Sequence, residues 1–576
     1  MIEKHIEGLN LTVKQAEPVS IKQPVGRIST LVIALCALAF VLCALLSVAP
    51  LSRILDPVIQ LQTPFGTQLA QVGAWLPTDI GLTPYRRASL AGTGYIEFLA
   101  LIALAFAIYG LCALFIQRRA PAHNQPALRL IWLATIVAGL IYVFTPAMLS
   151  HDIFVYASYG RVLAVYHNNP YFAPLSAFPQ DPFNALNYWA NATAAYGPVW
   201  IYICSLWGFV LGPQALGYVL AFRLFALAMH LLNTWLVATT LRTSGQSSRV
   251  VLLGTLLYAW NPLVLMESSF GGHNDVFMVT LLLVGILLSI RAEKRGQFTH
   301  PRGYVPPLIA FTLAALIKFT TLPLIVLFII FLTWRVLRPV QSSPALPFRK
   351  AVMQRWRPAL LTICIATISG GLLALVLYAP FWIPHNFTGI QHTFTRTPSA
   401  QFAEDSILLA IFKWYEANNN QPDYLVLQVL SARWAWDTIN TVVLAGFLLT
   451  GAFWLWRAPT IRTFILASLA TLGGLLIITP WFFSWYITWL IGLVVVCLPL
   501  AHNRLGRSLL AFTLAFSISA FSTYLFKDGI PPFGIWIGWV PLTTIALPLL
   551  AFLITFLTWR PVKQTPLGVE RIEVDI

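Results

Sequence analysis

Residues 29–49 read STLVIALCALAFVLCALLSVA, a stretch without a single charged side chain. A run of about 20 apolar residues can cross the hydrocarbon core of a bilayer as one α-helix. The stretch starts too late and runs too long for a typical cleaved signal peptide, so we interpret it as the first transmembrane span. Residues 1–28, which precede it, form a polar tail.

Comparable apolar runs follow along the rest of the chain, and none of them contains a run of charges. Because these runs are unbroken rather than alternating, they predict a helical bundle and not a β-barrel. They lie near residues 93–116, 127–149, 198–213, 215–241, 249–268, 275–292, 304–335, 359–383, 438–456, 461–479, 484–500, 507–526 and 535–558.

The composition of the whole chain leads to the same class. Of its 576 residues, 58% are hydrophobic and 10% are charged, whereas about a quarter are charged in soluble domains. This excludes a soluble globular enzyme, a disordered protein and a disulfide scaffold. The cysteines lie in apolar segments without CxxC spacing, which is typical of small core residues. They are Cys36, Cys43, Cys112, Cys204, Cys364 and Cys497.

The distribution of lysines and arginines predicts the orientation of the bundle. The net charge of +16 indicates basic residues on the cytoplasmic side of the spans, and not a nucleic-acid partner. Two runs are ambiguous: 198–213 is short, and 304–335 is too long for one span. If 198–213 lies on the outer face and 304–335 is a hairpin of two short helices, most of the 36 basic residues fall inside. If 198–213 crossed instead, the basic cluster at 291–302 would move outside, which is the worse solution.

We therefore expect an all-α polytopic membrane protein with about 14 transmembrane helices, external juxtamembrane helices and both termini in the cytoplasm. The expected segments are a cytoplasmic tail (1–28), N-terminal spans (29–149) with an external loop (50–92), an external catalytic loop with juxtamembrane helices (150–214), core spans (215–383), an external loop (384–437), C-terminal spans (438–558) and a second cytoplasmic tail (559–576). Membrane lipids are partners of such a chain, notably through the basic loop 336–358.

The first candidate site begins where the third span ends, at Ser150-His151-Asp152. An ionisable residue near membrane depth costs several kcal/mol unless it is paired or solvated, so it is a functional candidate. Asp152, Tyr156 and Tyr159 are spaced i, i+4 and i+7, which places them on one helix face. The alternative is that Asp152 only caps the following helix.

The second candidate is the segment 267–275, Glu-Ser-Ser-Phe-Gly-Gly-His-Asn-Asp, a glycine turn between two spans. The glycines permit positive φ and a close backbone approach. A plain turn needs the two glycines, but it needs neither His273-Asn274-Asp275 at the boundary nor Glu267 at the end of the preceding helix. A plain turn remains the alternative.

Three further features complete the candidates. Lys318 lies at the tip of the expected hairpin, where it either snorkels to the headgroups or supplies a point charge for a phosphate. Arg223 lies inside a span and needs a carbonyl or an anionic partner, structural or ligand. The aromatic segment 479–489, which contains Trp485 and Tyr486, either anchors the chain at the outer interface or stacks on a sugar.

These motifs carry a resemblance to a known family. Asp152 after an early span, then Tyr-x2-Tyr-Gly-Arg ending at Arg161, Asn-Pro-Tyr, and the Tyr-Gly-Pro that begins at Tyr196 resemble the GT-C fold glycosyltransferases. The turn Gly-Gly-His-Asn-Asp is similar to that of a narrower group, the polyprenol-phosphomannose-dependent α-1,6-mannosyltransferases of lipomannan synthesis. The resemblance covers nearly the whole chain from about residue 93, although the chain has His151-Asp152 where many relatives have Asp-x-Asp.

The resemblance implies an inverting membrane glycosyltransferase of the cell membrane with its active site on the external face. The expected donor is a polyprenyl-phosphate sugar, most simply mannose, with arabinose and glucose left open, and the acceptor is a glycolipid or glycan. It implies Asp152 as the base, with Asp275 as a second catalytic carboxylate. The expected substrate-binding residues are His151, Tyr156, Arg161, Tyr196, Glu267, His273, Asn274, Lys318, Trp485 and Tyr486.

No metal and no other cofactor are expected, because a lipid-phosphate leaving group does not need the metal that a nucleotide diphosphate usually does. The opposing hypothesis is a transporter or flippase of a lipid-linked saccharide, which predicts broken helices, midplane charges and repeat symmetry. A non-catalytic membrane scaffold is a third possibility that no motif favours.

Overall fold

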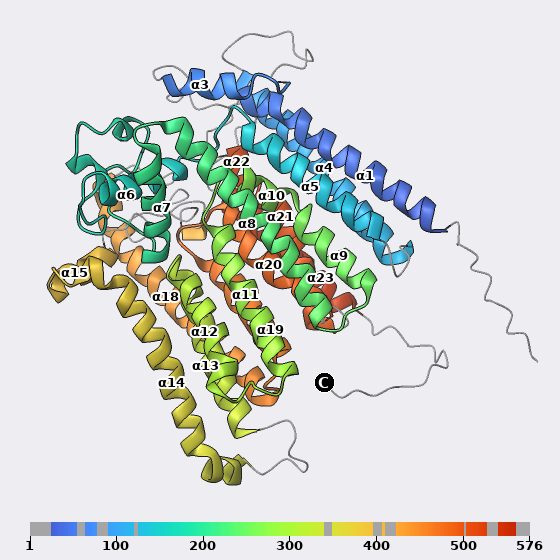
Figure 1. Cartoon of the computed structure of the whole chain (residues 1–576), viewed down its shortest axis with the longest axis vertical. Helices are drawn as coiled ribbons and strands as arrows, with labels where there is room; N and C mark the ends of the chain where they lie inside the picture. The colour runs from blue at the N-terminus through green and yellow to red at the C-terminus, as the bar shows by residue number, and fades with distance from the viewer. Residues whose placement is uncertain are drawn as a thin grey trace, which may run out of the picture.

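The computed structural model describes residues 25–53, 64–77, 90–119, 125–338, 348–395, 406–408, 410, 422–499, 503–526 and 539–559. Within these ranges the chain is helical and has no strand (Figure 1). The expected all-α polytopic architecture is therefore confirmed. The two expected cytoplasmic tails lie almost wholly outside the described residues, as do parts of the loops 50–92 and 384–437.

Eleven helices of the described chain are long and apolar enough to cross a membrane, and a bent pair raises this to 12. The two remaining runs of the predicted 14 are the short helices α12 (Pro301–Ala315) and α20 (Ile487–Val496). The number that cross therefore stays a prediction. The long helices are α1 (Val25–Arg53), α4 (Leu90–Arg119), α5 (Gln125–Phe144), α8 (Ala215–Thr243), α11 (Asp275–Lys294), α13 (Leu322–Leu337), α14 (Phe348–Trp382), α18 (Pro422–Arg457), α19 (Ile461–Ile478), α21 (Arg504–Ser519) and α23 (Trp539–Thr558).

The apolar run 249–268, expected as one helix, is broken into α9 (Ser248–Ala259) and α10 (Pro262–Ser269), which meet at 52°. Pro262 has no N–H for the helix ladder, so the chain starts a new helix there. The side chain of Asn261 caps this helix by accepting from Val264 N at 3.2 Å. The break directs the last turn of α10, with Glu267, into the bundle.

The expected hairpin within 304–335 is confirmed. Lys318 lies between α12 and α13, and its Nζ atom contacts Asp275 at the start of α11. Arg335 at the end of α13 pairs with Glu293 at the end of α11, with 2.5 Å between Nη2 and Oε1. Therefore α13 runs parallel to α11 and returns antiparallel to α12.

The segment between α5 and α8 holds α6 (Asp152–Ala164), two 3₁₀ turns (Leu175–Ala177 and Pro182–Ala185) and α7 (Pro198–Leu211). The 14 residues of α7 span about 21 Å, which is short of the roughly 30 Å of a bilayer core. Its residues Phe209 and Val210 are 67% and 66% exposed, which suits a helix at the membrane interface.

Helices α6 and α7 pack almost backbone to backbone. A Cβ atom on Gly160 would lie 2.1 Å from the carbonyl oxygen of Cys204, and one on Gly208 would lie 2.8 Å from the carbonyl oxygen of Gly160. Glycine is therefore required at both crossing points, since any larger residue would separate the helices.

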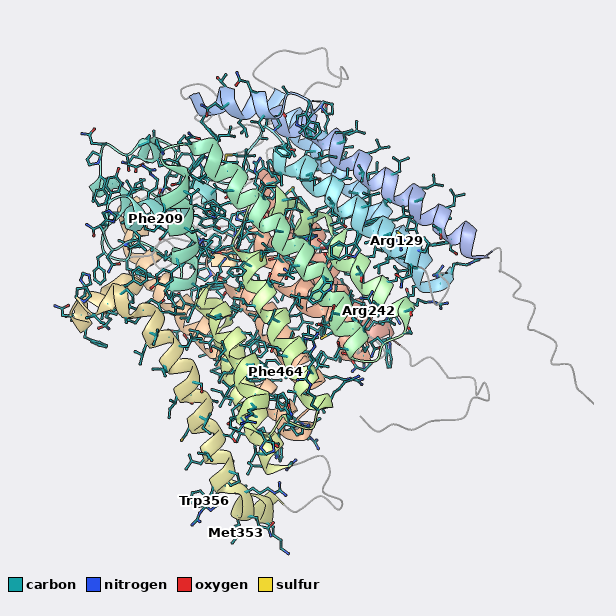
Figure 2. All side chains as sticks on the ribbon, in the orientation of Figure 1. Arg129, Phe209, Arg242, Met353, Trp356 and Phe464 are labelled. Atoms are coloured by element: carbon teal, nitrogen blue, oxygen red, sulfur yellow. The ribbon has the colours of Figure 1, made fainter. Side chains whose placement is uncertain are left out.

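Large apolar side chains cover the outside of the bundle, including Leu111 (64% exposed) on α4, Leu449 (71%) on α18 and Leu557 (72%) on α23. Such apolar faces are suited to contact with the acyl chains of lipids. Figure 2 shows Arg129, Arg242 and Trp356 far from α7, which carries Phe209. The basic segments predicted to be cytoplasmic thus lie away from the segment predicted to be external.

Candidate active site

Helix α6 presents Asp152 at its first turn. His151 occupies the N-cap position without a side-chain cap hydrogen bond, and Asp152 is the first helical residue. The Tyr156 hydroxyl, one turn later, donates to Oδ2 of Asp152 at 3.3 Å. Both Asp152 and Tyr159 line the same cavity, so these two residues share the predicted helix face, and the N-cap position belongs to His151 rather than Asp152. Burial and the carboxylates nearby raise the pKa of Tyr156 well above its usual value, so its hydroxyl stays a neutral donor.

The glycine turn between α10 and α11 brings His273 against Asp152. Gly272 has φ +65°, and a Cβ on Gly271 would lie 2.5 Å from the imidazole of His273. The His273 Nδ1 atom lies 3.5 Å from Oδ2 of Asp152, and Nε2 lies 3.3 Å from Oε2 of Glu267. These are long distances for hydrogen bonds but short ones for ion pairs. Gly271 therefore gives the imidazole the room it needs between two carboxylates, and Gly272 supplies the positive φ of the turn.

Those two carboxylates control the charge of His273. Burial by itself would lower the pKa of the imidazole, but the contacts with Asp152 and Glu267 outweigh burial and raise the pKa to about 9. His273 is therefore an imidazolium at neutral pH. The ring of Trp485 stacks on it, with the centroids 3.9 Å apart and the planes at 14°, which also favours the cation.

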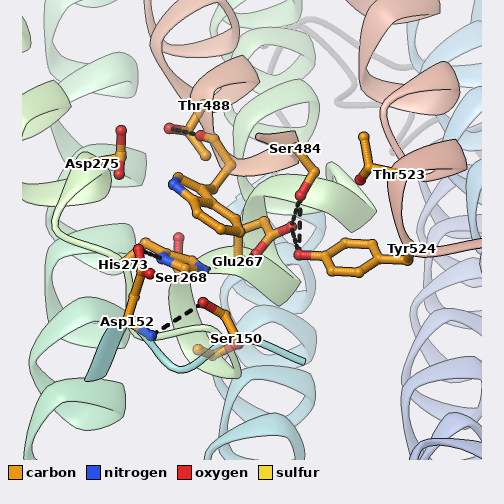
Figure 3. Close-up of polar contacts among 12 residues, drawn as sticks. Ser150, Asp152, Glu267, Ser268, His273, Asp275, Ser484, Thr488, Thr523 and Tyr524 are labelled. Carbon is orange, nitrogen blue, oxygen red and sulfur yellow. Dashed lines mark hydrogen bonds and ion pairs between the residues drawn. The ribbon is translucent and has the colours of Figure 1, made fainter. Parts of the chain in front are cut away.

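Glu267 lies behind His273 and is 1% exposed. Its Oε1 atom accepts from the Ser484 hydroxyl at 2.7 Å and from the Tyr524 hydroxyl at 2.6 Å (Figure 3). Two hydroxyls and an imidazolium thus surround one buried carboxylate.

Lys318 and Asp275 form a second buried pair. The Nζ atom of Lys318 donates to Oδ1 of Asp275 at 2.8 Å, and the same oxygen accepts from the Trp489 indole at 2.6 Å. The ammonium lies over the ring of Tyr486, 3.9 Å from its centroid. Lys318 is 8% exposed, so it does not snorkel to the headgroups.

A cavity of about 320 Å³ opens in front of these groups. Its walls combine one carboxylate, one ammonium and many aromatic faces. The residues that line it are Asp152, Val155, Tyr159, Trp189, Ala195, Tyr196, Lys318, Phe319, Thr320, Leu475, Leu476, Thr479, Pro480, Trp481, Phe483, Trp485, Tyr486 and Trp489.

Five of the predicted site residues therefore line the cavity, namely Asp152, Tyr196, Lys318, Trp485 and Tyr486. Four others lie directly behind it. They are Glu267 and His273, described above, Asp275, which pairs with Lys318, and Asn274. The Oδ1 atom of Asn274 lies 3.5 Å from the Tyr156 hydroxyl and accepts from it. Tyr156 itself bridges Asp152 and Asn274, which ties α6 to the turn.

The structure does not bring Arg161 or His151 to the cavity. Arg161 is nine residues after Asp152, about 180° around α6. Its Nε atom donates to Oδ2 of Asp181 at 2.7 Å, in a buried pair. The imidazole of His151 contacts the carbonyl oxygen of Leu186 at 3.1 Å. Both residues therefore order the segment 150–214 and do not line the cavity.

Arg223 also has a structural partner. Its guanidinium donates to the carbonyl oxygens of Val143 at 3.1 Å, Thr145 at 2.9 Å and Ala147 at 2.5 Å. These carbonyls lie in the last turn of α5 and just beyond its end, where the helix leaves carbonyls unpaired. Arg223 thus fixes the chain just before Asp152.

Sequence reasoning did not name three residues of the network as site residues: Ser484 and Trp489, which lie within the candidate segment 479–489, and Tyr524. Trp489 follows Trp485 at i+4, so helical spacing alone could have placed it on the same face. Nothing near Tyr524 in the sequence signals its contact with Glu267, because the two residues are 257 positions apart. Among the described residues, no group of three or more histidines, cysteines and acidic residues could hold a metal ion.

Fold and site together define a class: an all-α polytopic membrane protein with a buried acid–base cluster behind an aromatic cavity. Residues 63–336 match the family model described as alpha-(1->6)-mannopyranosyltransferase, N-terminal domain. The match includes Asp152, Asp275 and Lys318 and ends before Trp485. The predicted resemblance to α-1,6-mannosyltransferases is confirmed.

Individual relatives agree with the family model. A probable alpha-(1->6)-mannopyranosyltransferase of Mycolicibacterium smegmatis is 26% identical over 267 residues, 46% of this chain and 44% of that protein. Alpha-(1->6)-mannopyranosyltransferase B of Corynebacterium glutamicum is 28% identical over 172 residues, 29% of this chain and 27% of that protein. The matches thus span less than half the length of these curated relatives. No solved structure matches the chain significantly.

Proposed function

We propose that the protein is a membrane mannosyltransferase that moves a mannosyl group from a polyprenyl monophosphate to a hydroxyl of a glycolipid or glycan. The observation that carries this proposal is the cavity in which Asp152 and Lys318 face the same space among tryptophans and tyrosines. We further propose that this space opens on the external face of the cell membrane, with both termini in the cytoplasm.

The cavity wall suits a sugar phosphate. The rings of Trp189 and Trp481 lie 5.8 Å apart at 65°, and Phe483 stacks on Trp485 at 4.4 Å. Aromatic faces of this kind pack against the apolar face of a sugar ring. Lys318 supplies the positive charge that the departing polyprenyl phosphate needs. The mostly apolar remainder of the wall suits a donor delivered from lipid.

Asp152 serves as the general base of the proposed reaction. The acceptor hydroxyl attacks the anomeric carbon, the bond from that carbon to the phosphate oxygen breaks, and the proton of the hydroxyl passes to Asp152. The polyprenyl phosphate leaves with the electron pair. One in-line displacement inverts the anomeric centre, like one half of inverting glycosidase chemistry.

Asp275 is assigned to positioning and not to proton transfer. It is 1% exposed, does not line the cavity, and its Oδ1 atom already accepts from Lys318 and Trp489. In the proposed mechanism it holds the ammonium in place for the phosphate.

The test is an assay of the purified, lipid-reconstituted protein with a panel of polyprenyl-phosphate sugars and short mannosyl acceptors. We expect mannose transfer from the mannosyl donor and none with Asp152→Asn. Translocation of the donor across the bilayer without transfer would instead support the flippase hypothesis. Transfer of arabinose or glucose would keep the mechanism and change the sugar.

A further inference from the structure

We propose that Glu267 acts on the reaction through His273: the two residues form a charge pair behind Asp152 that keeps this base ionised and oriented. Glu267 is then a positioning residue, and not the substrate-binding residue that its sequence motif predicts. The charge pair itself follows from the geometry of the described residues. Its effect on the reaction rests on the proposed function.

The geometry is a chain of contacts that leads from the bundle interior to the cavity. The hydroxyls of Ser484 and Tyr524 donate to Glu267 Oε1. Glu267 Oε2 faces Nε2 of His273, and Nδ1 of the same ring faces Asp152. Only the last member of this chain, Asp152, lines the cavity.

The charges of these side chains explain the order of the contacts. Two carboxylates, Asp152 and Glu267, lie on opposite edges of one imidazole that is 2% exposed. If the imidazole were neutral, one of its nitrogens would be a lone pair facing a carboxylate in a low-dielectric site, which is repulsive. An imidazolium presents a positive N–H edge to each carboxylate at ion-pair distance, and the contact with Glu267 favours that form.

Other charged groups near the cluster are already paired. On the α11 side, Asp275 is held by Lys318. On the α8 side, Arg223 donates to three carbonyls and lies over the ring of Phe270, 4.7 Å from its centroid. Tyr156 on α6 contributes a neutral hydroxyl to Asp152. Glu267 is therefore the carboxylate behind His273 whose removal should change the charge of the imidazole most.

The consequence for the reaction has a definite sign. The imidazolium is present below a pH of about 9, so activity should fall as pH rises through this value. In Glu267→Gln an opposing charge at 3.3 Å is lost. The pKa of His273 should then drop by at least about one unit, and the alkaline fall in kcat/KM should move down by the same amount.

The experiment compares pH profiles of kcat/KM for the full-length protein in lipid nanodiscs. Glu293→Gln is the matched control, because it removes a carboxylate from an ion pair with Arg335 at the far end of α11. Its profile should equal that of the wild type. An unmoved alkaline limb in Glu267→Gln would overturn the proposal.

A second readout does not need catalysis. A protonated imidazole quenches an indole stacked on it, so Trp485 fluorescence should report the charge of His273. We expect a transition near pH 9 in the difference between wild type and His273→Gln, and a lower midpoint in Glu267→Gln. A shifted midpoint in a protein without transferase activity would leave the charge pair standing and refute the proposed function. An unshifted midpoint in an active enzyme would refute the charge pair.

Tyr524→Phe gives a milder form of the same test if Glu267→Gln does not fold. It removes one hydrogen bond to Glu267 and keeps the ring. With one donor fewer, Glu267 should stabilise the imidazolium more strongly, so the midpoint and the alkaline limb should move up, by a smaller amount than Glu267→Gln moves them down. No movement in a folded Tyr524→Phe protein would count against the proposal.

Discussion

Lys318 and Asp275 lie 43 positions apart in the chain and meet with 2.8 Å between Nζ and Oδ1. Burial lowers the pKa of the Lys318 amine, and Asp275 opposes this shift. The carboxylate of Asp275 thus holds the amine of Lys318 at the wall of a cavity whose proposed ligand is a phosphate.

The first prediction concerns this pair. Lys318→Met should destabilise the protein by about 3–5 kcal/mol, because it leaves a buried carboxylate without its cation. The double variant Lys318→Met with Asp275→Asn should recover most of the thermal stability and none of the activity. Recovery of activity in the double variant would show that the ammonium has no part in donor use. The measurements are thermal unfolding in nanodiscs and donor KM.

The second prediction concerns the base. Asp152→Asn keeps the size of the side chain but cannot take up a proton at neutral pH, so turnover should fall roughly 10²–10⁴-fold. Donor binding should survive. For comparison, we expect Asp275→Asn to lose more stability than Asp152→Asn and to have a raised donor KM. If Asp275→Asn abolishes turnover while Asp152→Asn stays active, the base is Asp275.

The third prediction concerns the contact between α6 and α7. Gly160→Ala would place a Cβ atom 2.1 Å from the carbonyl oxygen of Cys204, so the helices must separate. We expect a loss of at least about 1–3 kcal/mol. Gly446→Ala on α18 is the control, since a Cβ atom there meets nothing within 4 Å. Equal melting temperatures for the two variants would contradict the packing.

The fourth prediction concerns orientation. Single cysteines placed in the loop 291–302 should be labelled only from the cytoplasm, and cysteines near Phe387 should be labelled from outside. A background without the exposed Cys364 avoids unwanted labelling. External labelling of the loop 291–302 would mean that α7 crosses the membrane.

Much of the fold was predictable because hydrophobic runs of this length have one physical solution in a bilayer. The hairpin around Lys318 and the helix face of Asp152 followed from charge and spacing alone. The 52° break at Pro262 was not predicted, although a proline inside a run is its ordinary cause. Periodicity alone does not say where a continuous apolar run bends.

The site was predictable only where its residues are close in the sequence. The pattern Gly-Gly-His-Asn-Asp marked His273 as a site residue, and the structure brings it to Asp152. The role of Glu267, however, depends on Ser484 and Tyr524, which are more than 200 positions away. Arg161 was assigned to the site from its position in the linear motif. On the helix α6 it lies about 180° from Asp152 and faces away from it. Tertiary contacts of this kind leave no local signal.

The wide spacing of the site along the chain has a consequence for biogenesis. Asp152 leaves the ribosome long before Trp485 and Tyr524, and at about 5–20 residues per second the delay is roughly 20–70 seconds. During the first part of that time Gly197 and Val199 also lack the backbone of Leu316 and Ile317, to which their N–H groups donate. The early spans therefore enter the membrane with an unfinished catalytic loop. A nascent chain arrested before residue 480 would be inserted, but Glu267 would lack both of its hydroxyl donors.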